Sequence, residues 1–200
     1  MNVGQRFARL ATDVVVRRPM LWRLFRGPLR ASFNRLAPVW DTMRRPDSFA
    51  PVEAALDRLG AQPRRVLDLG TGTGAVARVV AERFPEAEVV GADLSPRMIE
   101  QARRLTDSSH VTYHVADAQK LPFADGSFDL ITLANMIPFF DQLARLTAPG
   151  GHVLIAFSAG PETPIYVPPQ RLRKELGRHG FMEFAEVSAG RGTAFLARKS

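Results

Sequence analysis

The stretch Val66-Leu67-Asp68-Leu69-Gly70-Thr71-Gly72-Thr73-Gly74 decides the fold of this 200-residue chain. Its first four residues predict a short, largely apolar strand. Three glycines at alternate positions follow, and they allow a tight turn in which a ligand can approach bare backbone. A helix that starts behind them offers free N–H groups and the positive end of its dipole. The stretch therefore predicts a strand, a turn and a helix that bind a ligand at the turn.

Strands and helices alternate on both sides of this turn. The expected strands are residues 66–69, 88–92, 111–115, 128–133, 152–157, 181–187 and 193–198, and the expected helices are residues 74–84, 95–105, 139–147 and 168–179. This alternation predicts an α/β fold with a doubly wound, mainly parallel sheet of seven strands and an antiparallel hairpin at its C-terminal edge. Ligands of such sheets bind at the carboxyl ends of the strands.

Residues 1–60 have a different pattern. Apolar residues recur at helical spacing, and a helix is expected over residues 48–59. Prolines divide the segment into separate helical pieces, at Pro19, Gly27-Pro28, Pro38, Pro46 and Pro51. We therefore expect two parts: a helical N-terminal arm of residues 1–60 and a ligand-binding domain of residues 61–200.

The composition excludes several classes of protein. The chain has no cysteine, which rules out disulfides, thiolate metal sites and cysteine nucleophiles. No apolar run approaches the length of a membrane span, and the N-terminus does not have the pattern of a secretory signal. A reducing cytoplasm is the expected location.

Positive charge is concentrated in the arm. Residues 1–45 contain ten arginines against Asp13 and Asp41, a net charge of +8, whereas residues 46–200 carry 17 basic and 18 acidic side chains. Aromatic residues lie among these arginines, at Trp22 and Phe25. The arm is expected to be a solvated helix face, or to contact an anionic membrane surface or an amphipathic acceptor. The arginines do not favour nucleic acid as a partner, because no recognition module accompanies them.

Three carboxylates lie at or just after the ends of strands at the expected ligand site, and they favour one of two kinds of nucleotide ligand over the other. Residues 72–77 match the Gly-x-Gly-x-x-Ala fingerprint of dinucleotide-binding enzymes, and Asp93 suits the acid that binds a ribose. Asp68, however, would repel a pyrophosphate at this turn. Together, Asp68, Asp93 and Asp117 favour a cationic adenosyl ligand over NAD.

The chain resembles the class I S-adenosylmethionine-dependent methyltransferases, a Rossmann-like family, over residues 64–157 by motif and to about residue 198 by strand order. Asp-Leu-Gly-Thr-Gly-Thr-Gly at residues 68–74 resembles the first motif of the family. Residues 89–98 resemble the second, and residues 116–123 resemble the third. Residues 128–131 and 146–151, which contain Phe-Asp-Leu-Ile and Pro-Gly-Gly, resemble later strand entries. The resemblance implies methyl transfer from S-adenosylmethionine.

By position, the resemblance implies roles at the adenosine end of this cofactor. Asp93 would bind both ribose hydroxyls. Leu94 and Met98 would cover one face of the adenine. Asp117 would accept from the exocyclic amine, and Ala118 would donate its backbone N–H to a ring nitrogen.

The resemblance also implies roles at the methionine end. Gly70, Thr71 and Gly72 would lie along the methionine moiety. Gly74, in the same turn, would also bind the cofactor. Asp68 would lie near the amino group. Asn135, at the end of the fourth strand, would lie near the transferred methyl.

The acceptor cannot be identified from the residues. The stretch at residues 135–141 is short and apolar, and it departs from the motifs of several acceptor classes. No general base and no metal site is evident. We expect a small or amphipathic acceptor, with the arm as the lid of its pocket. A module that senses the cofactor without turnover is the alternative, as is an NAD-type enzyme.

Overall fold

The computed structural model of the chain describes residues 3–60 and 62–200. The helices are α1 (Val3–Arg17), α2 (Trp22–Leu36), α3 (Ala50–Leu56), α4 (Ala75–Arg83), α5 (Pro96–Leu105), α6 (Phe140–Leu146) and α7 (Pro169–Arg178). The 3-10 turns are η1 (Pro19–Leu21), η2 (Ala37–Val39), η3 (Asp41–Met43) and η4 (Gly160–Glu162). The strands are β1 (Arg65–Leu69), β2 (Glu88–Asp93), β3 (Val111–Val115), β4 (Phe128–Ala134), β5 (Thr147–Phe157), β6 (Phe181–Ala189) and β7 (Gly192–Lys199).

The seven strands form one sheet in the order β3-β2-β1-β4-β5-β7-β6. The first five strands are parallel, whereas β7 is antiparallel to both β5 and β6. The predicted α/β class, the seven strands and the antiparallel C-terminal hairpin are confirmed. The second strand of that hairpin lies between β5 and β6, so β6 forms the edge of the sheet.

Each face of the sheet has its own apolar core. Helices α3, α4 and α5 cover one face, where Val80 and Ile99 are buried against Leu130. Helices α6 and α7 cover the other face, where Leu143 and Leu172 belong to the second cluster. Buried residues of α1 and α2 join this second cluster, so the arm is part of the same folded body.

Several helix ends lie where the sequence predicts them. Ser95 precedes α5, and its side chain accepts a hydrogen bond from the N–H of Met98 (3.1 Å). Pro96 follows at the first helical position, where its missing N–H costs no intrahelical bond. Strand β5 starts earlier than expected, at Thr147, and contains the Pro-Gly-Gly turn.

The expected break at Gly27-Pro28 is wrong. Helix α2 runs without interruption from Trp22 to Leu36 and contains Pro28. Leu24, Gly27 and Pro28 are all exposed, so water can reach the Leu24 carbonyl that loses its N–H partner. The opposite side of the helix buries Trp22 and Leu29, and this burial holds the helix in place.

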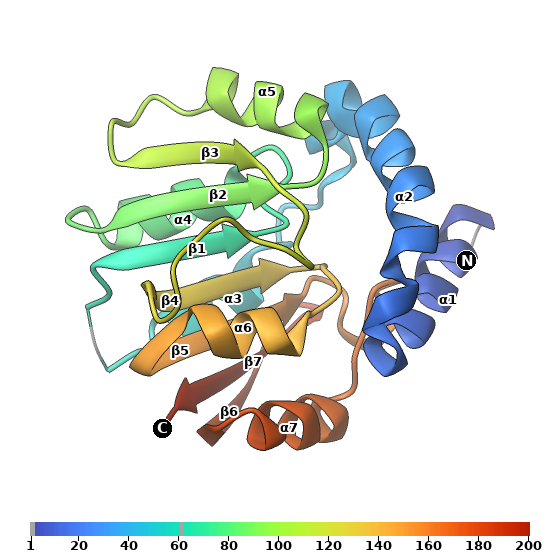
Figure 1. Cartoon of the computed structure of the whole chain (residues 1–200). Helices are drawn as coiled ribbons and strands as arrows, with labels where there is room; N and C mark the ends of the chain where they lie inside the picture. Colours follow the sequence, from blue (N-terminus) through green and yellow to red (C-terminus); the bar gives the residue numbers. More distant parts are fainter. Residues whose placement is uncertain (1–2, 61) are drawn as a thin grey trace.

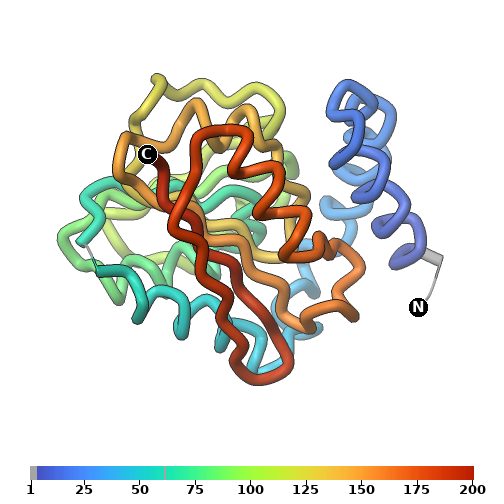
Figure 2. Tube along the Cα trace, turned by 90° about the horizontal axis from the view of Figure 1, so that it is seen from below, coloured from blue at the N-terminus to red at the C-terminus, as the bar shows by residue number. Residues whose placement is uncertain are grey.

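The arm lies across the carboxyl ends of the strands. Figure 1 shows α2 beside the tips of the central strands, with α1 on the side of α2 that faces away from the sheet. Figure 2, turned by 90°, shows the two blue helices beside the sheet and away from the hairpin of β6 and β7. The boundary expected between the two parts falls at residues 60 and 61, of which Ala61 lies outside the described residues.

Candidate functional site: the carboxyl ends of β1, β2 and β4

The glycine turn has the conformation that its sequence predicts. Gly70, Gly72 and Gly74 adopt φ angles of +73°, +56° and +79°, in the left-handed region that favours glycine. Gly74 is the N-cap residue of α4, and because it has no side chain it makes no capping hydrogen bond to the first turn of the helix. Thr73, which follows the second glycine, instead donates its hydroxyl to Asp41 Oδ1 of η3 (2.7 Å). The turn is therefore joined directly to the arm.

Asp68 is buried beneath this turn. Thr71 Oγ1 donates to Asp68 Oδ2 (2.6 Å), and Thr132 Oγ1 of the adjacent strand donates to Oδ1 (2.8 Å). Burial raises the pKa of Asp68 to about 6, although the threonine hydrogen bonds offset part of the effect. The carboxyl group thus holds Thr71 and links β1 to β4. Its contact with an amino group of the cofactor stays a prediction.

Asp93 ends β2 beside the same turn. Its Oδ2 accepts from the N–H of Gly72 (3.0 Å), and its Oδ1 accepts from the N–H of Ser95 (2.8 Å). Burial raises the pKa of Asp93, and the backbone N–H donors offset part of this rise. The carboxylate therefore joins the glycine turn to the start of α5.

The acceptor capacity of Asp93 fits a ribose. A carboxylate has about four lone-pair positions, and the N–H groups of Gly72 and Ser95 occupy two of them, while the N–H of Leu94 also faces the carboxylate. The carboxylate keeps acceptor capacity for the hydroxyls of an adenosyl ribose. The backbone of Gly70 and Gly72, which has no side chain of its own, lies in the turn that Asp93 holds, so these residues fit an adenosyl cofactor.

Asp117, which was expected to accept from the adenine amine, is held by the arm. Trp22 Nε1 donates to Asp117 Oδ1 (2.7 Å), and the N–H of Gln119 donates to the same oxygen (3.0 Å). Arg26 donates to Oδ2 (3.2 Å). Three of about four acceptor positions are therefore used. One position is left for an adenine amine while α2 stays in place. Movement of α2 would free the two positions that Trp22 and Arg26 use.

The predicted adenine-contacting residues differ in exposure. Met98 is 1% exposed and Ala118 is 5% exposed, so both belong to the interior. Leu94 is half-buried and packs against the core cluster of α6 and α7. Of the two residues expected to cover the adenine, Leu94 therefore presents more surface.

Asn135 follows β4 with a left-handed backbone (φ 52°), which asparagine adopts more readily than most residues. Its Nδ2 donates to Ser158 Oγ (2.9 Å), and its Oδ1 accepts from the N–H of Ser158 (2.9 Å). This reciprocal pair fixes the ends of β4 and β5 against each other. A role near the transferred methyl stays a prediction.

Two bulky side chains lie against the glycine backbone. A Cβ built on Gly70 would lie 2.8 Å from Met136 Sδ, and one on Gly72 would lie 3.5 Å from Trp40 Nε1. A methionine moiety along this turn would therefore contact or displace Met136 and Trp40. Trp40 in turn meets Phe33 of α2 edge-on, with ring centroids 5.7 Å apart.

A second hydrogen bond joins α2 to the site near Asp93. Ser95 Oγ donates to Asn34 Oδ1 (2.7 Å). The sequence offered no signal for the Asn34–Ser95 and Trp22–Asp117 contacts, because their partners are 61 and 95 residues apart. No group of three or more His, Asp or Glu side chains within residues 3–60 and 62–200 could hold a metal ion.

The strand order, the glycine turn and the acid at the end of β2 define the class: this is a Rossmann-like methyltransferase fold. Solved structures share it. An S-adenosylmethionine-dependent methyltransferase of Aquifex aeolicus has a TM-score of 0.68 at 19% identity, covering 82% of this chain and 98% of that chain. Human N-acetylserotonin methyltransferase has a TM-score of 0.62 at 20% identity, covering 88% and 56%.

Residues 66–151 match the family model described as a methyltransferase domain. The chain belongs to the class I S-adenosylmethionine-dependent methyltransferase family. It is 39% identical over 140 residues to a demethylmenaquinone methyltransferase of Thermus thermophilus, covering 62% of each chain. It is 33% identical over 159 residues to a ubiquinone/menaquinone biosynthesis C-methyltransferase of a Geobacter species, covering 69% of this chain and 66% of the relative.

A further relative differs in its acceptor. The malonyl-[acyl-carrier protein] O-methyltransferase of Geobacter sulfurreducens is 40% identical over 96 residues, covering 48% of this chain and 36% of the relative. The chain thus spans less than two thirds of the length of each of these three relatives.

Proposed function

We propose that the chain transfers a methyl group from S-adenosylmethionine to a ring carbon of a demethylated quinol, the reduced form of the quinone. The S–CH3 bond breaks as the C–CH3 bond forms, S-adenosylhomocysteine leaves, and the ring carbon gives up its proton. The observation that carries the reaction class is the Asp93 carboxylate, which ends β2 and holds the positive-φ glycine turn through the N–H of Gly72. The acceptor is supported by the names of two relatives, the demethylmenaquinone methyltransferase of Thermus thermophilus and the ubiquinone/menaquinone biosynthesis C-methyltransferase of the Geobacter species.

The residues of the site would bind and orient the cofactor. Asp93 would hold the ribose, and the methionine moiety would lie along the Gly70–Gly72 backbone once Met136 and Trp40 give way. S-adenosylmethionine supplies a methyl group that its sulfonium already activates. Alignment of the acceptor and exclusion of water therefore remain for the protein.

Aromatic and apolar side chains favour a flat, apolar acceptor. Met136 is half-buried and lies against Gly70. Phe33 and Trp40 are also half-buried and meet edge-on beside Gly72, with ring centroids 5.7 Å apart. A quinone ring has apolar faces that suit such walls. Because most of these side chains come from the arm, we propose that residues 1–60 form the lid over the catalytic domain of residues 61–200.

The exposed surface of the arm suits a membrane that contains the acceptor. Phe7, Leu10, Met20 and Leu24 are 37%, 57%, 67% and 65% exposed. Exposed arginines lie among them, at Arg6, Arg17, Arg18, Arg23, Arg26 and Arg30. Apolar side chains with arginines bind anionic lipid surfaces. We therefore propose a cytoplasmic enzyme that docks peripherally through residues 1–45. None of the helices in the described part of the chain has the length and apolarity needed to span a membrane.

Methyl-labelled S-adenosylmethionine tests the reaction. The chain is incubated with a reduced, short-chain demethylmenaquinone analogue, with malonyl-acyl-carrier protein, or without acceptor. We expect label on a ring carbon of the quinone analogue alone. Label on the malonyl ester would replace the proposed acceptor with an oxygen acceptor. Cofactor binding without label in any acceptor would favour the sensing module.

Sedimentation with vesicles tests the membrane contact. The chain should sediment with anionic phospholipid vesicles at low salt, and salt should release it, because the Debye length falls from about 30 Å at 0.01 M to about 8 Å at 0.15 M. A Leu10→Ser/Leu24→Ser double variant should sediment less, since two exposed apolar side chains are lost. Equal sedimentation with neutral vesicles would contradict the electrostatic contact.

A further inference from the structure

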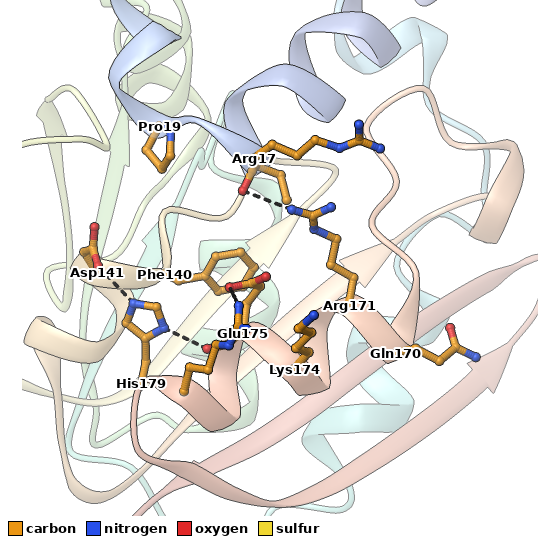
Figure 3. Close-up of a pocket in the computed structure, with 11 residues that line it drawn as sticks. Arg17, Pro19, Phe140, Asp141, Gln170, Arg171, Lys174, Glu175 and His179 are labelled. Carbon is orange, nitrogen blue, oxygen red and sulfur yellow. Dashed lines mark hydrogen bonds and ion pairs between the residues drawn. The ribbon is translucent and has the colours of Figure 1, made fainter.

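A cavity of about 720 Å³ lies between the arm and helices α6 and α7, and neither the glycine turn nor Asp93 lines it. Figure 3 shows its lining. Arg17 approaches from the end of α1, whereas Arg171, Lys174 and Arg178 come from α7. Cationic side chains from two elements that are far apart in the sequence therefore converge on one cavity.

The acids of this cavity already have partners. Glu175 pairs with Arg178 (3.6 Å), and Asp141 pairs with His179 Nε2 (2.9 Å). The other ring nitrogen of His179 faces the Glu175 carbonyl oxygen (2.7 Å). Burial lowers the pKa of His179, but these oxygen acceptors outweigh burial and raise it overall. The two carboxylates therefore leave Arg17, Arg171 and Lys174 without a counter-ion.

Arg171 has an unsatisfied donor in the wall. Its Nε is buried and has no hydrogen-bond partner, and its Nη2 reaches only the Val16 carbonyl oxygen, at 3.5 Å. A buried donor without a partner is costly, and a guanidinium carries five donors. Within residues 3–60 and 62–200, the side chains of Arg17 and Lys174 also make no hydrogen bond or ion pair. The cavity thus holds three cations whose donors are largely unused.

We propose that this cavity binds a phosphate-type oxyanion through Arg17, Arg171 and Lys174. A phosphate group presents several acceptor oxygens, so it can satisfy a guanidinium fork and an ammonium group together. The site is separate from the proposed methyl transfer and does not depend on it.

The neighbourhood of the cavity indicates two sources of such an oxyanion. Pro19 lines the cavity, and the adjoining Met20 is 67% exposed, as a membrane-facing side chain would be. A phosphomonoester lipid could reach the cavity from a bilayer. A free phosphate compound could enter it from water.

Nitrogen-detected NMR and calorimetry on the full chain test the site with inorganic phosphate and glycerol 3-phosphate. Vesicles of phosphatidylcholine with phosphatidic acid, or with phosphatidylglycerol at equal charge, test the lipid source. The Nε–H resonance of Arg171 should shift when the oxyanion binds. A preference for phosphatidic acid would identify the lipid headgroup as a source, because its phosphomonoester has more free oxygens than a diester.

An Arg17→Gln/Lys174→Gln variant provides the decisive comparison, because both side chains are exposed and unpaired. Its matched control is Arg64→Gln/Arg104→Gln, which removes the same charge from exposed positions outside both the cavity and residues 1–45. Loss of two charge-assisted hydrogen bonds should lower oxyanion affinity at least about tenfold, whereas the control should retain the affinity of the native chain. Equal losses in both variants would overturn the proposal. So would the absence of binding to every probe.

Discussion

Replacement of the buried acid beneath the glycine turn gives the sharpest test of the site's electrostatics. Burial raises the pKa of Asp68 from 3.8 to about 6. Between these values the folded chain binds more protons than the unfolded chain, so its stability falls as pH rises. A shift of about 2 units at 1.36 kcal/mol each makes the ionised carboxylate cost about 3 kcal/mol above pH 6.

An Asp68→Asn variant removes this titration and can still hydrogen-bond Thr71 and Thr132. The free energy of unfolding of the variant, relative to the native chain, should therefore increase by about 2.4 kcal/mol between about pH 4 and about pH 7. Urea unfolding without ligand at both pH values measures it. Asp107→Asn, at an exposed position, is the control and should show no such trend. A relative stability of Asp68→Asn that does not change with pH would refute the reasoning.

Three further predictions concern the cofactor and the arm. Asp93→Ala should lower the affinity for S-adenosylhomocysteine about tenfold to a hundredfold in calorimetry, because hydrogen bonds to charged groups contribute about 1.5–3 kcal/mol; unchanged affinity would exclude the ribose role. Trp22→Phe removes the N–H that Trp22 donates to Asp117. Amide hydrogen exchange of α2 should therefore become about tenfold to a hundredfold faster, without loss of cofactor affinity. An unchanged exchange rate would show that this contact does not hold the arm. A chain shortened to residues 46–200 loses the buried side chains of α1 and α2 and should unfold at lower urea. Its folded form should still bind cofactor but should lose methyl transfer, and full turnover would rule out the lid.

The fold was largely predictable because local signals agreed with tertiary structure. Alternating strands and helices, the cap at Ser95 and the positive-φ glycines each act within a few residues. Pro28 misled the prediction because its helix is held by the burial of Trp22 and Leu29, which a local breaker signal does not reveal. The position of β7 inside the hairpin edge was also not encoded in the spacing of the strands.

The candidate site was predictable only in part. The sequence located Asp68, Asp93 and the glycine turn, since these residues follow strands at fixed spacing. It did not predict that Trp22 would bond Asp117, or that Arg171 and Arg17 would share a cavity. Such contacts join residues far apart in the chain, and they depend on how α1 and α2 pack across the sheet.

Ligand-dependent stability tests the central claim, that the glycine turn and Asp93 bind an adenosyl cofactor. The free energy of unfolding is measured with S-adenosylhomocysteine, with NAD and without ligand. At a hundredfold excess over the dissociation constant, binding to the folded chain alone adds about 2.7 kcal/mol. We predict this gain with S-adenosylhomocysteine, its loss in Asp93→Ala, and no gain with NAD. Stabilisation by NAD and not by S-adenosylhomocysteine would contradict the account.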